Sequence, residues 1–211
     1  IYYIEDIDSL RFALSIEKYS LIDFQPHFPG YPVFCSIGKI LFFITGNIGV
    51  TFSIIGGFSV FVIIYYVLRL LNTTLTSRSG VFCFLLIFFN PLIWLMSNRY
   101  MPDILGLAIA IAGLYYLLRI DKEEKNLIIG ALLVGLLAGT RLSYIPLLVI
   151  PFVYIIIVNH KRIYILAGFL FGCMVWLIPL IWITGINDLI MVAEKQTSGH
   201  FSDFGGTVAL G

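Results

Sequence analysis

Acidic side chains near the start of the chain are the first candidates for chemistry. Glu5, Asp6 and Asp8 lie within one short stretch, and such neighbouring carboxylates are typical of a proton-accepting or cation-binding role. A simpler interpretation is a helix start, with Asp8 or Ser9 capping a helix over residues 10–19. One cap does not account for Glu5 and Asp6 as well.

A proline-rich stretch follows over residues 25–32, with the sequence Gln-Pro-His-Phe-Pro-Gly-Tyr-Pro. Its prolines and glycine predict a stiff extended turn instead of a helix or strand. Such a turn would hold His27 and Tyr31 in fixed positions, and His27 is a candidate ligand or proton donor. The stretch could equally serve only to end one helix and begin the next.

Three later segments carry isolated charges beside apolar runs. Arg99 and Asp103 occur in the segment 97–103, where they form either a functional pair or a local ion pair at a helix start. Arg141 follows a Gly-Thr turn, and a guanidinium buried near a membrane interface usually pairs with carboxylate or phosphate. Lys195 and His200 lie in a C-terminal segment that is either an ordered loop over a site or a linker.

The composition places these residues in a membrane protein. The chain of 211 residues is 60% hydrophobic and 12% charged, which excludes a soluble globular enzyme and a disordered chain. Its 13 Lys and Arg residues are scattered, which argues against nucleic acid as a partner. Cys35, Cys83 and Cys173 lie in apolar runs and are predicted to be buried packing thiols.

Apolar stretches that approach the length of a membrane span cover more than half of the chain. They are residues 48–71, 80–97, 103–119, 127–140, 142–158 and 163–183. Asn90-Pro91 predicts a kink within the second stretch. We therefore predict an all-α fold, a polytopic transmembrane helical bundle with an extracytoplasmic loop that carries short interfacial helices.

The distribution of Lys and Arg predicts the orientation of these spans. One side receives Arg69, Arg78, Arg119, Lys122, Lys125, Lys161 and Arg162, whereas the opposite short loops hold Arg99 and Arg141. The first side is therefore cytoplasmic. Of the 12 acidic residues only Asp121, Glu123 and Glu124 fall on it, so the outer face is acidic.

Residues 33–45 decide whether the candidate residues share that face. This apolar segment is too short to span a bilayer, so we expect an interfacial helix with Lys39 reaching toward water. If it spanned, the first acidic residues and Asp103 would lie on opposite sides. The predicted organisation is an outer loop over 1–47, about six spans over 48–183 and an outer loop over 184–211. The chain begins with Ile1 and is predicted to be truncated at both ends.

These motifs together resemble the first outer loop of the GT-C glycosyltransferases. The similarity is to the branch with protein O-mannosyltransferases and lipid A aminoarabinose transferases, which have an acidic motif, a His-Pro-Pro-Gly-Tyr-Pro turn and a later Asp, here Asp103. Phe28 replaces the first proline of that turn, and Asp6 and Asp8 both fit the family's catalytic position. The Asp-x-x-Arg-aromatic-Ala pattern favours Asp8.

The resemblance implies an integral plasma-membrane enzyme whose active site faces outward. A polyprenyl-phosphate-linked sugar would be the donor, and a lipid, glycan or protein the acceptor, in contact with membrane lipids. Asp8 or Asp6 would be the general base, with Asp103 orienting a cation or binding the acceptor. Arg99, Arg141, Lys195 and His200 would stabilise the departing phosphate, and His27 and Tyr31 would contact substrate.

No cofactor is firmly expected, although Glu5 and His27 are candidate ligands for a divalent metal. Two ligands fall short of a metal site. The alternatives to an enzyme are a secondary transporter and a membrane scaffold without catalysis. A transporter normally carries ionisable residues near the middle of the bilayer and repeated halves, which this sequence lacks. A scaffold has no need of outer carboxylates beside a rigid turn.

Overall fold

The computed structural model describes residues 6–118 and 124–202, and the side chains within these ranges as far as residue 199. The regular elements in this part of the chain are helices, apart from one isolated antiparallel bridge between Ser20 and Gln25. The predicted all-α class is confirmed.

Two short helices, α1 (Ile7–Glu17) and α2 (Pro32–Thr45), flank the proline-rich turn. Asp6 caps α1, because its carboxylate accepts a hydrogen bond of 2.6 Å from the backbone N–H of Ser9. The predicted cap at Asp8 or Ser9 was therefore wrong. Helix α2 begins at Pro32, where the missing N–H removes no helical hydrogen bond.

As far as the structure describes them, the six apolar stretches are helical. They are α3 (Ile48–Leu70), the pair α4 (Arg78–Phe88) and α5 (Pro91–Ser97), α6 (Asp103–Leu118), α7 (Glu124–Thr140), η1 (Leu142–Tyr144) with α8 (Ile145–Val158), and α9 (Arg162–Thr184). Helices α4 and α5 meet at 54°, which confirms the kink at Asn90-Pro91. Residues 186–202 form a further helix, α10 (Ile186–Ser202), within the segment predicted as a loop.

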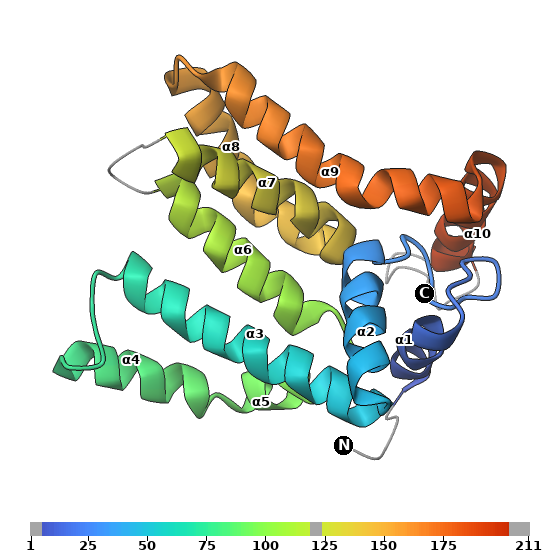
Figure 1. The fold of residues 1–211 in the computed structure, drawn as a ribbon, viewed down its shortest axis with the longest axis horizontal. Coiled ribbons are helices and arrows are strands. Elements are labelled where there is room, and N and C mark those ends of the chain that lie inside the picture. The colour runs from blue at the N-terminus through green and yellow to red at the C-terminus, as the bar shows by residue number, and fades with distance from the viewer. Residues whose placement is uncertain (1–5, 119–123, 203–211) are drawn as a thin grey trace.

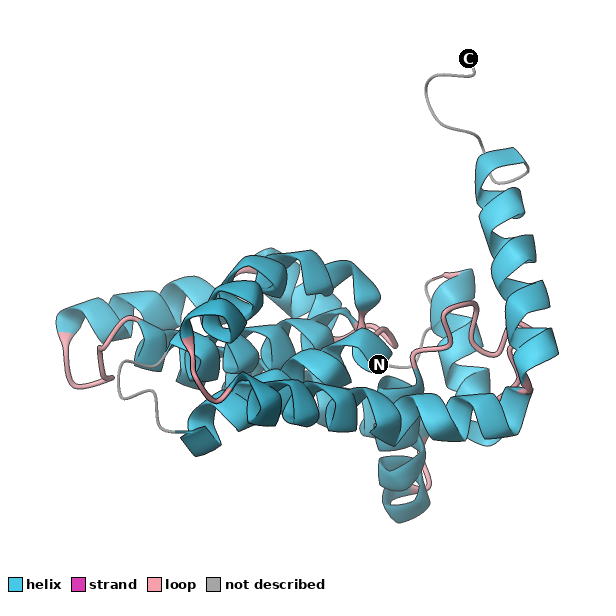
Figure 2. Ribbon diagram, turned by 90° about the horizontal axis from the view of Figure 1, so that it is seen from above, coloured by secondary structure: helices cyan, strands magenta, loops and turns pink. Residues whose placement is uncertain are grey.

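The long helices run side by side, and α1 and α2 lie across one end of them (Figure 1). The start of α6, the end of α7 and the start of α10 lie at the same end. We call this the site end, comprising α1, residues 18–31, α2, the α5–α6 and α7–η1 connections, and α10. Seen from above, α10 stands away from the bundle (Figure 2). Loops distant in sequence therefore meet at one place.

Small residues bring α7 and α9 into close contact. A methyl group on Gly135 would collide with the backbone of Phe169, and one on Gly172 with the backbone of Leu132. Trp176 also donates a hydrogen bond of 2.9 Å from Nε1 to the carbonyl of Gly135. Close packing of helix backbones through glycine is typical of helices in membranes.

Among the described residues, two helices, α3 and α9, are long and apolar enough to cross a membrane, and the bent α4–α5 pair is a third if it counts as one span. Large apolar side chains lie exposed on the outside of the bundle, among them Phe43, Ile150 and Trp182. Of the three cysteines, Cys35 is buried, whereas Cys83 and Cys173 are half-buried. The prediction of three buried thiols thus holds for Cys35 alone.

Candidate functional site

Asp6 and Arg99 form an ion pair across the site end. The Oδ2 atom of Asp6 lies 2.8 Å from Nη2 of Arg99. Arg99 is placed there by its neighbour Tyr100, whose buried ring stacks on Phe52 of α3 at 4.5 Å between centroids. Burial acts to raise the pKa of Asp6, but hydrogen bonds from Ser9 and the Arg99 charge outweigh it and lower that pKa. Asp6 is therefore a weak base.

Asp8 lies in the first turn of α1 and faces two other groups. Its Oδ1 atom lies 3.1 Å from Nη1 of Arg11 and 3.5 Å from Nδ1 of His27. The second separation is too long for a hydrogen bond, and the buried Nδ1 of His27 has no such bond among the described residues. The Asp8 side chain is 39% exposed. Its carboxylate is therefore accessible beside an unsatisfied ring nitrogen.

The proline-rich turn fixes His27 against Tyr31. His27 Nε2 lies 3.0 Å from the Tyr31 hydroxyl, and the rings of His27 and Tyr31 pack edge to face on Phe12 of α1. Gly30 has a φ of +92°, and its carbonyl accepts a hydrogen bond of 2.9 Å from the Tyr19 hydroxyl. Tyr31 itself has a φ of +44°, a conformation that a non-glycine residue adopts only where its surroundings impose it.

Arg141 joins this turn to the start of α6. Its Nη2 lies 2.9 Å from Oδ1 of Asp103, and its Nη1 donates a hydrogen bond of 3.4 Å to the Tyr31 hydroxyl. The guanidinium also lies over the Tyr31 ring. Gly106 makes room for it, since a Cβ atom there would lie 2.6 Å from the Arg141 Cβ.

Five side chains thus form a continuous series of contacts, which we call the polar network: Asp8, His27, Tyr31, Arg141 and Asp103. They come from α1, the proline-rich turn, the α7–η1 connection and α6. Burial lowers the pKa of His27 despite the nearby Asp8 carboxylate, and burial raises the pKa of Tyr31 despite Arg141. At neutral pH both rings are therefore uncharged.

Lys195 approaches the same end from α10. Its ammonium lies 5.5 Å from the centre of the Phe24 ring, and the Arg11 guanidinium lies 5.2 Å from that centre. Phe24 therefore places one cation from α1 near one from α10. His200 belongs to α10, but its side chain lies outside the described residues.

A metal site is not evident in the described part of the chain. The residues of that part contain no group of three His, Cys, Asp or Glu side chains arranged to hold a metal ion. Glu5, one of the two candidate ligands, lies outside the described residues.

The sequence did not identify Arg11 and Phe24 as residues of the candidate site. Arg11 follows Asp8 at a spacing that favours an ion pair on a helix, so the Arg11–Asp8 contact was predictable. Nothing in the sequence indicated a role for Phe24, because that role depends on how α10 packs against residues 18–31. Val192 of α10 packs there with Leu21 and Leu180.

Comparisons with known proteins leave the family open. No protein-family model, curated protein or solved structure matches the chain.

Proposed function

We propose that the chain is part of a membrane glycosyltransferase of the GT-C type that uses a polyprenyl-phosphate-linked sugar. The observation that carries this proposal is the polar network, in which an accessible carboxylate, an uncharged histidine and an Arg–Asp pair adjoin at one end of an apolar bundle. Glycosyl transfer needs a base for the acceptor and positive charge for the leaving phosphate. The site end supplies both.

Asp8 is the proposed general base. It accepts a proton from the acceptor hydroxyl, whose oxygen then forms a bond to the anomeric carbon while the bond from that carbon to the phosphate oxygen breaks. Asp6 suits this role less well, because both its oxygens are engaged, Oδ1 by Ser9 and Oδ2 by Arg99, and these contacts lower its pKa. In this proposal Asp6 positions Arg99 near the reacting groups.

Cations from three elements surround the place where the phosphate leaves in this proposal. Arg141 is oriented by Asp103 and Tyr31, Arg99 by Asp6, and Lys195 by the Phe24 ring. A preorganised positive charge stabilises a developing phosphate without reorienting during the reaction. Asp103 accordingly acts through Arg141 or binds the acceptor, and His27 and Tyr31 line the acceptor side.

The proposal places the bundle across a membrane with about six spans and the site end outward. The turns at the opposite end carry Arg69, Arg78, Lys161 and Arg162, as expected for a cytoplasmic face. Helix α2 crosses the ends of the long helices (Figure 1), as an interfacial helix would. The acceptor is then a lipid, glycan or protein at the outer surface.

The direct test is transfer of labelled sugar from polyprenyl phosphate by membranes that contain the full-length protein. We expect Asp8→Asn to lower the transfer rate about 100-fold or more, as loss of a general base does, and Asp103→Asn to lower it less. Asp23→Asn is the matched control, because Asp23 pairs with Lys18 on the exposed surface. Wild-type rates for Asp6→Asn, Asp8→Asn and Asp103→Asn, each correctly inserted, would exclude the mechanism.

A further inference from the structure

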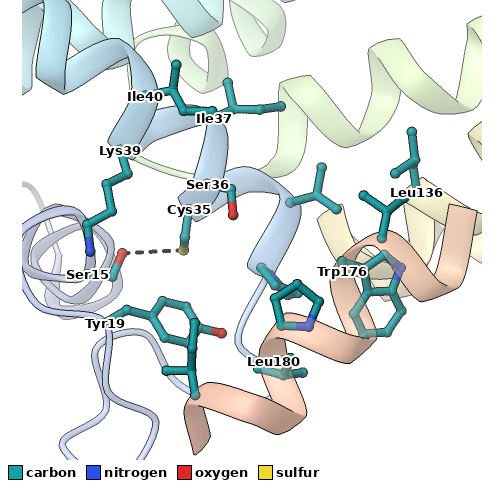
Figure 3. Close-up of a pocket in the computed structure, with 15 residues that line it drawn as sticks. Ser15, Tyr19, Cys35, Ser36, Ile37, Lys39, Ile40, Leu136, Trp176 and Leu180 are labelled. Carbon is teal, nitrogen blue, oxygen red and sulfur yellow. Dashed lines mark hydrogen bonds between the residues drawn. The ribbon is translucent and has the colours of Figure 1, made fainter.

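A cavity of about 290 Å³ lies between α2 and α9, with walls from the end of α1 and from α7. Its lining is predominantly apolar and includes Ile37, Ile40, Trp176 and Leu180 (Figure 3). The wall formed by α9 runs from Val175 to Ile183, about 12 Å along the helix axis. This length and this surface suit a hydrocarbon chain.

The cavity is separate from the polar network. Asp8, His27, Tyr31, Asp103 and Arg141 are all absent from its lining. A ligand that lies in this cavity does not contact these residues, and we take it as a second ligand, separate from the sugar donor. The cavity adjoins the proline-rich turn through Tyr19 and Pro32.

The cavity lining includes a cationic side chain, that of Lys39. Lys39 extends from α2 toward Ser15 of α1 (Figure 3), and in the part of the chain that the structure describes it has no carboxylate within ion-pair distance. An ammonium group at a membrane surface attracts anionic head groups. Under the membrane placement proposed above, α2 lies at that surface and the α9 wall descends into the outer leaflet.

We propose that this cavity binds one acyl chain of an anionic phospholipid, whose phosphate pairs with Lys39. The occupant is an ordinary membrane lipid instead of the sugar donor. The inference rests on the proposed membrane placement, but not on Asp8 being a catalytic base. Lipid binding and sugar transfer can therefore fail independently of each other.

The test uses the full-length protein in phosphatidylcholine vesicles with and without phosphatidylglycerol. A trace of phosphatidylglycerol or phosphatidylcholine carrying a photoreactive acyl chain is crosslinked, and the labelled peptides are identified by mass spectrometry. We expect phosphatidylglycerol to label α2 and α9 preferentially. Lys39→Gln should reduce this preference about fivefold, and Lys39→Arg should retain it.

Filling the cavity gives an independent readout. Val175 and Met174 are equally exposed, at 49%, but only Val175 lines the cavity. Val175→Trp should therefore abolish labelling of α2, whereas Met174→Trp should leave it unchanged. Equal labelling by both lipids, equal effects of the two tryptophans, or displacement of the label by polyprenyl phosphate but not by phosphatidylglycerol would overturn the proposal.

Discussion

Arg141 is the residue on which the polar network depends most. It pairs with Asp103 and donates to Tyr31, while its Nε atom is buried without a hydrogen bond in the described residues. A sequence can mark Arg141 as functional, because a guanidinium beside apolar helices is costly unless it is paired. The sequence predicts that Asp103 orients a cation or binds the acceptor, but that its partner is Arg141 depends on how α6 and α7 pack.

His27 gives the site a pH dependence. Its pKa in the folded protein is lowered from the usual 6.5, chiefly by burial, so below about pH 6.5 the unfolded chain binds a proton that the folded chain does not. The contribution of His27 to stability is thus complete above this pH and decreases as the pH falls. We expect thermal unfolding of His27→Gln in detergent to depend less on pH below 6.5 than that of the wild type. An unchanged pH dependence would contradict the assignment.

At the scale of elements, the sequence predicts where the helices lie along the chain, but it does not predict which elements contact one another. The six apolar stretches, the kink before Pro91 and the break after Thr140 all occur in the structure, because each follows from local hydropathy or from proline. Helix α10 was missed, since its glycine and polar residues are typical of a loop. The Asp6–Arg99 pair was missed because it joins elements far apart in the chain.

The contact between α6 and Arg141 can be tested at Gly106. A Cβ atom there would lie 2.6 Å from the Arg141 Cβ, whereas at Gly113 on the same helix it would meet ordinary contacts of 3.4 Å or more. Gly106→Ala should displace Arg141, destabilise the protein by about 1–3 kcal/mol and reduce sugar transfer. Gly113→Ala is the control and should leave both properties near wild type, which unfolding temperature and transfer rate would show.

If Gly106→Ala and Gly113→Ala behaved alike in both measurements, close packing against Arg141 would not be what holds the network together. A loss of stability without any loss of transfer would likewise separate the α6–Arg141 contact from the chemistry.

At the scale of the whole molecule, most of the acidic residues that the structure describes are sorted to the site end of the bundle, which also holds the cations Arg11, Arg99, Arg141 and Lys195. The site end carries Asp6, Asp8 and Asp103, and the opposite turns carry Arg69 and Lys161, the latter paired with Glu124. This sorting follows from the sequence once the spans are placed. The proposal as a whole requires that the loops of the site end share one face of a membrane.

Cysteine labelling of intact cells measures this requirement directly. Exposed positions at the two ends, Ile7, Asn98 and Leu75, are changed singly to cysteine in a chain whose own cysteines are replaced by alanine. A membrane-impermeant maleimide should label Ile7→Cys and Asn98→Cys from outside, and Leu75→Cys only after permeabilisation. Labelling of Ile7→Cys and Asn98→Cys from opposite faces would contradict a shared outer site.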